Sequence, residues 1–129
     1  DSLAIAIAAT SGMVRDMTAN KDAMRAALTT GFPTATDLAD YMVRELGLPF
    51  REAHHASGSI VALAAKKGCD LDALSLAEMQ TVEPRIKADI MGILTVESAV
   101  AARTSFGGTA PTELKARIAD ARSRFNIKG

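Results

Sequence analysis

The chain has 129 residues, 48% of them hydrophobic, and its 15 basic and 15 acidic residues cancel to a formal net charge of zero. That size can bury one compact core, and a neutral chain lacks the positive field that attracts nucleic acid or anionic lipid, so we expect neither nucleic acid nor membrane as a partner. The single cysteine, Cys69, cannot form an internal disulfide, which is typical of a reducing, cytoplasmic location.

The N-terminal segment is strongly apolar. Residues 3–9 are apolar without interruption, but no basic region precedes them and they are far shorter than the ~20 residues that span a bilayer, so we expect them to be neither a signal peptide nor a membrane anchor. A helix over Ser2–Met17 would be apolar nearly all round, as helices surrounded by other helices are. Because the chain begins at Asp1 without an initiator methionine, we expect residues 1–18 to end a longer bundle helix, and residues 19–129 to form a separate helical domain.

The remaining segments read as helices. No segment alternates polar and apolar residues over a strand length, so the predicted fold class is all-α, a compact multi-helix domain after the end of the bundle helix. Asn20 can cap a short helix over Lys21–Leu28 by accepting a bond from a free first-turn amide. Residues 30–33 then interrupt the helical pattern.

The next helix has a start and a stop signal. Thr34 with Asp37 forms a plausible capping box, with Thr36 as a competing cap, for a helix that reaches Leu46. Gly47 supplies a left-handed exit.

Two further helices follow. Pro49 is placed to begin a helix that runs to Lys67 and ends at Gly68. A second capping box, Ser75 with Glu78, predicts a short helix to about Val82.

Pro84 is then predicted to start another helix whose apolar stripe faces the core. That stripe comprises Ile86, Ile90, Ile93 and Leu94. The segment Thr95–Arg103 either continues this helix or restarts after a bend.

A last helix is predicted after the interruption at Gly107 and Gly108, beginning at Thr109 or Ala110. One of its faces carries Leu114, Ile118, Ala121 and Phe125. Its cations gather towards the C-terminus, where they complement the helix dipole. Without interleaved aromatic residues, this basic surface is interpreted as a solvated face and not as a patch for an anionic partner. Those cations are Lys115, Arg117, Arg122, Arg124 and Lys128.

His54 and His55 are the only histidines and therefore candidate ligands or bases. Adjacent helical residues point about 100° apart, whereas a shared metal needs ligands spaced by three or four residues. We expect His54 to be semi-buried on the side of Phe50, Ser57 and Val61, and His55 to be more exposed. Structural roles are favoured for both over metal binding or catalysis.

Three other motifs suggest chemistry. Ser57, Gly58 and Ser59 lack the glycine spacing of a hydrolase nucleophile elbow and are interpreted as helix-packing residues. Gly107–Thr109 precedes a helix but lacks the lysine of a phosphate loop, which favours a simple turn. Arg51 and Glu52, preceded by Arg44 and Glu45, are interpreted as groups of a fold-holding ion pair, with Asp37 and Asp40 as candidate partners.

The run Thr34–His55 carries a family signature. Its alanine-threonine-aspartate-leucine-alanine helix start and its proline-phenylalanine-arginine-glutamate-alanine-histidine motif resemble the C-terminal part of argininosuccinate lyase, in the fumarase/aspartase superfamily. The segment Leu76–Pro84 and the run Gly107–Pro111 have compatible sequence and spacing, so the resemblance extends over essentially the whole chain.

The resemblance implies a specific reaction for the complete protein. Members of this family cleave argininosuccinate to arginine and fumarate by β-elimination in arginine biosynthesis, without a metal or organic cofactor. Their homotetramers assemble active sites from several subunits around a long helical bundle. In this picture residues 1–18 end a bundle helix, and the partners of the chain are the rest of its subunit and the tetramer.

The family's catalytic loop has no counterpart in this sequence. That loop, glycine-serine-serine followed by methionine-proline, a lysine and an asparagine, supplies the catalytic serine, and Gly58–Ile60 does not match it. We therefore assign no catalytic, cofactor-binding or metal-binding residue, and expect the chain to be inactive alone. An independent α-helical interaction module and a crystallin-like structural member of the family remain alternatives.

Overall fold

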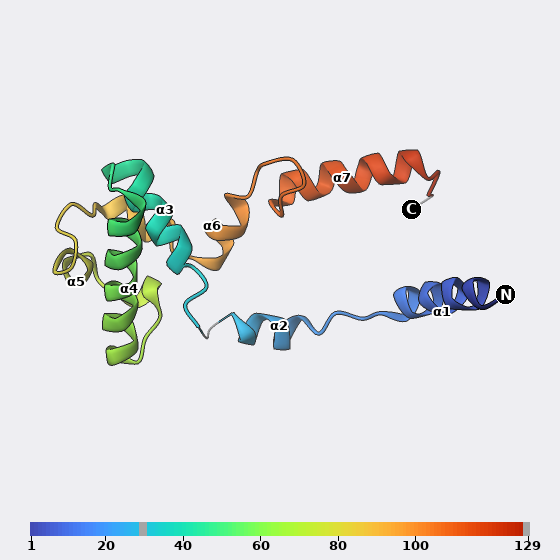
Figure 1. Ribbon diagram of the computed structural model, residues 1–129, viewed down its shortest axis with the longest axis horizontal. Helices are drawn as coiled ribbons and strands as arrows, with labels where there is room; N and C mark the ends of the chain where they lie inside the picture. The colour runs from blue at the N-terminus through green and yellow to red at the C-terminus, as the bar shows by residue number, and fades with distance from the viewer. Residues whose placement is uncertain (29–30, 128–129) are drawn as a thin grey trace.

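A helical hairpin organises the molecule. The computed structural model describes residues 1–28 and 31–127. Helix α3 (Ala35–Leu46) and helix α4 (Phe50–Lys67) are joined by residues 47–49 and cross at the left of Figure 1. Gly47 makes the tight reversal possible, because its φ of 68° is left-handed and lets the Leu48 amide reach back to the Met42 carbonyl at 3.1 Å.

The hairpin interface is apolar, with one buried polar contact. Leu38 and Met42 of α3 and Ile60 of α4 are each 0% exposed. Ser57 is also buried, and its hydroxyl donates to the Ala35 carbonyl at 2.7 Å. This bond ties the fourth helix to the first turn of the third, where a carbonyl can accept a second partner.

A series of short elements packs against the hairpin. They are η1 (Leu71–Ala73), α5 (Leu76–Gln80), η2 (Ala88–Gly92) and α6 (Val96–Ala101), the two η elements being 3₁₀-helices. Each contributes to the core or its margin, and the residues below 3% exposure are Leu71, Leu74, Met79, Ile86, Ile90 and Leu94. The hairpin and these elements together form a compact all-α body, as predicted.

The predicted helix after Pro84 is wrong. Residues 84–85 form a turn, and only the 3₁₀-helix η2 follows. The Glu83 carboxylate accepts bonds from the Arg85 amide at 3.0 Å and from its guanidinium at 2.8 and 3.0 Å. The Gln80 side chain donates to the Ile86 carbonyl at 2.7 Å. These side chains thus bond to backbone groups that would otherwise form the hydrogen bonds of a helix. Ile86 and Ile90 nevertheless face the core, as expected.

Helix boundaries agree with most of the capping signals. Ser75 and Glu78 form the expected capping box, although α5 ends at Gln80 and not near Val82. Helix α6 begins at Val96 with Thr95 as its N-cap, and the Thr95 hydroxyl accepts from the Ser98 amide at 3.1 Å. The segment Thr95–Arg103 therefore contains a new helix and does not continue an earlier one. Helix α4 begins one residue later than predicted, with Pro49 as its N-cap, and ends at Gly68.

The predicted capping box at Thr34 is wrong. Thr34 is the N-cap of α3, but its side chain makes no capping bond. Asp37 does not reach back to it, because the Asp37 carboxylate accepts a bond from Arg103 at 2.7 Å. The carboxylate therefore pairs with a cation that is distant in the sequence and does not complete the local capping box.

Among the residues that the structure describes, three helices lie outside this body. They are α1 (Ser2–Asp16), α2 (Lys21–Ala27), capped as predicted by Asn20, and α7 (Pro111–Arg124). In Figure 1, α1 and α7 project to the same side of the hairpin, and the chain ends lie there. Helix α2 meets α6 through an exposed ion pair, Arg25 with Glu97, at 2.5 Å.

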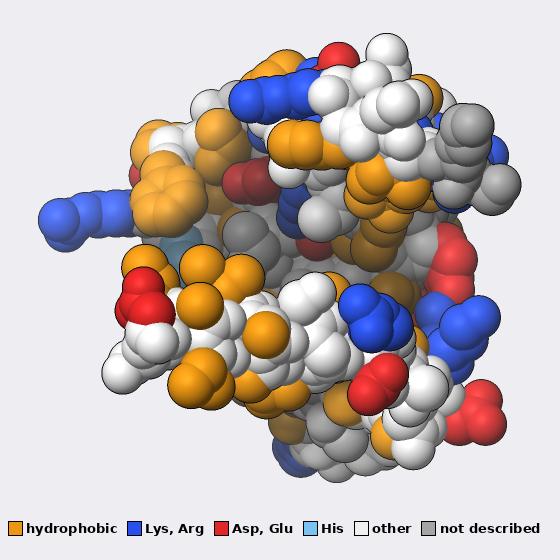
Figure 2. All heavy atoms as spheres, turned by 90° about the vertical axis from the view of Figure 1, so that its right-hand side faces the viewer, with side chains coloured by type: hydrophobic (Ala, Val, Ile, Leu, Met, Phe, Trp, Pro, Cys, Tyr) orange, Lys and Arg blue, Asp and Glu red, His pale blue; other side chains and the backbone are white. Residues whose placement is uncertain are grey.

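The projecting helices expose apolar side chains. Helix α1 buries no residue, and Leu3 and Met13 are 66% and 74% exposed. On the predicted face of α7, Leu114 and Phe125 are exposed too. Viewed from that side, hydrophobic side chains gather on α1 in the lower half of the molecule, and a hollow separates them from α7 (Figure 2). Within the described residues, no helix has the length and apolar character needed to span a bilayer.

Truncating the hairpin core should be costly, whereas the same truncation on α7 should not. We expect Leu38→Ala to lower the free energy of unfolding by about 2–5 kcal/mol, because it leaves a cavity in a packed interface. The exposed Leu114→Ala is the matched control and should change stability by less than about 0.5 kcal/mol. Urea unfolding followed by circular dichroism, at concentrations where the chain is monomeric, measures both. Similar losses in the two variants would contradict this description of the core.

The capping box of α5 should contribute to acid sensitivity. The Lys67 ammonium, and then the bonds from Ser75, lower the pKa of Glu78 from 4.5 to about 2. A carboxylate with a lowered folded-state pKa stabilises the fold above about pH 4.5 and loses that contribution as the pH falls towards 2. We therefore expect Glu78→Gln to lose stability less steeply than the wild type over this range, in urea unfolding at a series of pH values. Glu45→Gln, on an exposed part of α3, should keep the wild-type slope. Equal slopes for Glu78→Gln and wild type would refute the assignment.

Candidate functional site

The two histidines lie on different sides of α4. His54 lines a groove of about 180 Å³ between α3 and α4, and its ring centroid lies 6.0 Å from that of Phe50. We call this the α3–α4 groove; it is lined by Ala35, Thr36, Ala39, Asp40, Phe50, His54, Ser57, Gly58 and Val61. The expected neighbours of His54 are confirmed, but its predicted semi-burial is wrong. The ring is exposed because the small residues Ala35, Ala39 and Gly58 leave this groove open.

His55 faces a second depression. It lines a hollow of about 380 Å³ with Arg51, Glu52, Ala56, Ser59 and Val82, which we call the Arg51 groove. His55 is exposed beside Arg51 and Ser59, as predicted. Because the two rings enter separate grooves, they do not form one site. In the part of the chain that the structure describes, no three His, Cys, Asp or Glu side chains are grouped so as to hold a metal ion.

The predicted ion pair of Arg51 with Asp37 or Asp40 is wrong. Asp37 is bound by Arg103, and the cation near Asp40 is Arg44, at 4.0 Å on the same helix. Arg51 instead lines the Arg51 groove, as Val82 does. Sequence patterns relate residues about one helical turn apart. They could not predict this pairing, because the cation that pairs with Asp37 is 66 residues away in the sequence.

Two buried polar contacts hold distant segments together, and sequence reasoning missed both. The side chain of Asp37 is 8% exposed and pairs with the half-exposed Arg103. Tyr41 is 3% exposed, donates its phenol to Asp89 at 2.6 Å, and accepts from the Lys87 amide at 3.3 Å. Burial, and then the bond to Asp89, raise the pKa of Tyr41, so the phenol stays protonated and serves as a donor at neutral pH.

In the serine motif, Ser57 packs against α3 as predicted, whereas the packing role predicted for Gly58 is wrong, because a Cβ atom there would meet nothing within 4 Å. The Ser57 hydroxyl donates to the Ala35 carbonyl, and the Ser59 hydroxyl donates to the His55 carbonyl at 3.0 Å. A nucleophile needs its hydroxyl beside a general base, whereas both of these hydroxyls donate to backbone carbonyls. Gly107 and Gly108 form a turn, also as predicted, in which the Gly108 amide donates to the Ser105 carbonyl at 2.7 Å.

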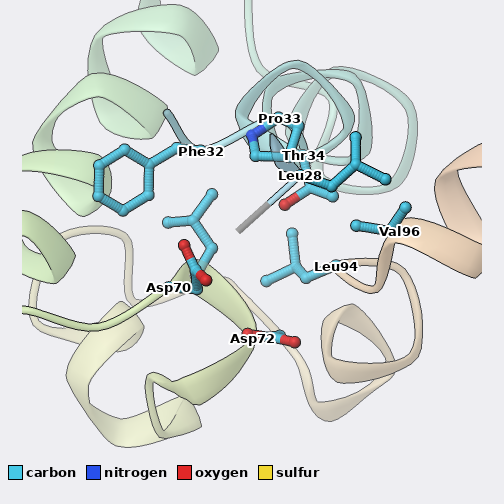
Figure 3. A pocket seen from close by; sticks show the side chains of 9 residues that line it. Leu28, Phe32, Pro33, Thr34, Asp70, Asp72, Leu94 and Val96 are labelled. Carbon is cyan, nitrogen blue, oxygen red and sulfur yellow. The ribbon is translucent and has the colours of Figure 1, made fainter. Parts of the chain in front are cut away.

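A smaller cavity lies where α2, the start of α3, η1 and α6 meet. It holds about 40 Å³ and is shown in Figure 3, where Phe32, Pro33 and Thr34 lie on one side and Leu94 and Val96 on another. The carboxylates of Asp70 and Asp72 lie at its edge. This volume is well below the ~300 Å³ at which sites for organic ligands begin, so the cavity is a packing gap between elements.

Comparison with known families accounts for this arrangement. Residues 32–101 match the model of the family described as argininosuccinate lyase, C-terminal. The chain belongs to this family. The matched residues are a little over half of the chain and run from the turn before α3 to the end of α6, so they coincide with the compact body. The resemblance seen in Thr34–His55 is thereby confirmed, while Gly107–Pro111 lies beyond the match and its assignment stays a prediction.

The structure shows that most side chains of the family signature have structural roles. Within Thr34–His55, Leu38, Tyr41 and Met42 form core, Asp37 holds Arg103, and Gly47 makes the hairpin reversal. The polar residues of the run that line the two open grooves are Thr36, Asp40, Arg51, Glu52, His54 and His55. The signature thus specifies a helical hairpin and its attachments.

Proposed function

We propose that the chain is the C-terminal domain of an argininosuccinate lyase whose complete form cleaves argininosuccinate to arginine and fumarate by β-elimination. The observation that supports this most directly is the family match over the whole compact body. On this proposal the enzyme acts in arginine biosynthesis in the cytoplasm, needs no metal or organic cofactor, and meets its substrate only in the complete assembly.

Within that enzyme, we propose a supporting role for the chain. Elimination requires a base to remove a proton next to a carboxylate and an acid to protonate the departing nitrogen, both within hydrogen-bond reach of the substrate. The serine hydroxyls of α4 bond to backbone carbonyls, and the two histidines enter separate grooves. The reacting groups are therefore proposed to come from other parts of the enzyme.

Helix α1 supports the proposal that residues 1–18 end a bundle helix. Leu3, Ile7, Thr10 and Val14 lie along one exposed face of α1, and Met17, directly after the helix, continues the same spacing. Their spacing alternates between four and three residues, which is the repeat of a helix-bundle seam. Side chains at such positions normally insert between residues of a neighbouring helix, and here they are exposed. The proposed partners are the bundle helices of the homotetramer.

A second candidate function rests on the same exposed helix. The seam on α1 would equally suit an independent helical interaction module that captures a partner helix. The two functions differ in the polypeptide made in the cell: a lyase domain belongs to a reading frame that also encodes the catalytic loop, and an independent module does not.

The chain alone should not release fumarate. We expect no rise in ultraviolet absorbance when the purified chain is mixed with argininosuccinate, under conditions where a complete argininosuccinate lyase gives a clear signal. The physical reason is that the proposed base and acid lie outside residues 1–129. Turnover at the rate of the complete enzyme would overturn the supporting role.

The seam on α1 should drive self-association of the isolated chain. An exposed apolar stripe of this kind is stabilised when another helix covers it, so we expect the wild type to sediment as an oligomer in analytical ultracentrifugation. The double variant Ile5→Lys, Ile7→Lys, which adds a charge to the seam at Ile7 and to the opposite, also exposed, face at Ile5, should shift it towards the monomer. Ala62→Lys with Ala65→Lys, which adds the same charge to exposed positions of α4, is the matched control and should sediment like the wild type. A wild type and an Ile5/Ile7 variant that are both monomeric would count against the bundle proposal.

A further inference from the structure

The segment between α6 and α7 is held in one shape by its own backbone. We call residues 102–110 the α6–α7 joint. Its Thr104 amide donates to the Ala102 carbonyl at 3.0 Å, its Gly108 amide to Ser105 at 2.7 Å, and its Ala110 amide to Arg103 at 3.1 Å. Three bonds within so short a segment describe a wound turn and not an extended linker.

Gly108 is needed for this winding. A Cβ atom at this position would lie 2.1 Å from the Arg103 carbonyl oxygen and 2.8 Å from that of Ser105. Both neighbours are backbone atoms, which cannot move aside as the end of a flexible side chain could. Any other residue at this position would therefore push the carbonyl of Arg103 away from the joint.

Arg103 connects the joint to the core. Its carbonyl accepts the bond from Ala110, the N-cap of α7, while its guanidinium donates to Asp37 on the first turn of α3. The Asp37 side chain is 8% exposed, so its position is fixed by the surrounding core. A charge-assisted bond to such a group is shorter and stronger than a neutral one. One residue thus contacts both the hairpin and the start of the last helix.

The start of α7 is fixed as well. Ala110 is 1% exposed, and Pro111 follows at the first helical position, where its ring presets the backbone angle of the helix. The Arg117 guanidinium lies 4.8 Å over the ring of Phe106, which is part of the joint. A contact between the joint and the second turn of the helix limits bending at their boundary.

We propose that the Asp37–Arg103 pair is a latch that sets the direction of α7 relative to the α3–α4 hairpin. With the latch formed, the joint is a rigid elbow. Without it, α7 swings about residues 102–110. In the complete lyase, the elbow presents Leu114 and Ile118 of α7 to the rest of the subunit at a set angle. This last step rests on the proposed function.

Pulsed electron paramagnetic resonance can test the latch in the full chain. Spin labels at the exposed positions Ala62 of α4 and Ser123 of α7, in a Cys69→Ser background, report the distance between hairpin and last helix. The labelled chain is diluted with excess unlabelled chain, so that distances between associated copies do not contribute. We expect one narrow distance distribution in this background. Arg103→Gln and Gly108→Ala should each widen it about twofold, because the freed joint then behaves as a short flexible linker. Arg44→Gln, which removes an arginine from an exposed pair at 4.0 Å, is the matched control and should leave it unchanged.

A second label pair separates a released elbow from a damaged core. Labels at Glu45 and Ala62, across the α3–α4 hairpin, should give a narrow distribution in every variant. Asp37→Asn tests the latch from its other end and should widen only the Ala62–Ser123 distribution. The double variant Asp37→Asn, Arg103→Gln should be no wider than either single one, since both remove the same contact.

Two results would overturn the latch. One is an Ala62–Ser123 distribution that is already broad in the starting background, and the other is one that stays narrow in both Arg103→Gln and Asp37→Asn. Fumarate release by the chain alone would refute the supporting role and leave the distance measurements unaffected, so failure of the proposed function and failure of the latch are distinguishable.

Discussion

The packing of α3 against α4 is the constraint on which the rest of the structure depends. Leu38, Met42 and Ile60 are excluded from water at this interface, and the bond from Ser57 to the Ala35 carbonyl ties the two helices where α3 begins. The later elements are too short to be stable helices alone. They are ordered because their apolar residues have the hairpin to pack against, as Met79 of α5 and Ile90 of η2 do.

Buried polar groups give this apolar core its specific attachments. Hydrophobic burial is non-directional, so it could not by itself decide where η2 or the α6–α7 joint lies along the hairpin. Tyr41 fixes the position of η2 through Asp89 and the Lys87 amide. Asp37 fixes the position of the α6–α7 joint through Arg103. Both anchoring side chains lie on α3, within the signature Thr34–His55. A family signature can therefore be built of residues that place other segments and need not contain reacting groups.

The molecule combines a compact body with projecting helices that expose apolar side chains. The body coincides with the residues that match the family. Helix α1 exposes its apolar residues, and α7 projects from the α6–α7 joint to the same side of the hairpin as α1 (Figure 1). An apolar seam in water is costly and is stabilised when another helix covers it. This division between core and projecting helices is the observation behind the proposed supporting role.

The sequence by itself determined the all-α class, most helix boundaries and the family. Those features depend on local signals: Asn20 and Ser75 act as caps, Gly47 and Gly68 end helices, and the spacing of Ile86 and Ile90 marks a core face. The apolar character of the first helix could also be predicted from its composition.

Only the tertiary structure decided how the polar residues are used. Asp37 left its expected capping box for Arg103, Glu83 and Gln80 replaced the helix predicted after Pro84 with a turn, and His54 proved exposed because small residues opposite it leave a groove. The partner of Asp37 lies 66 residues away in the sequence, and the exposure of His54 depends on which residues of α3 face it. The contacts of Glu83 and Gln80 are local, but they join side chains to Arg85 and to the Ile86 carbonyl in a turn that helical periodicity does not predict. Local sequence sets backbone propensity within a turn or two of helix, whereas the partner of a charge is chosen by the fold that brings it within reach.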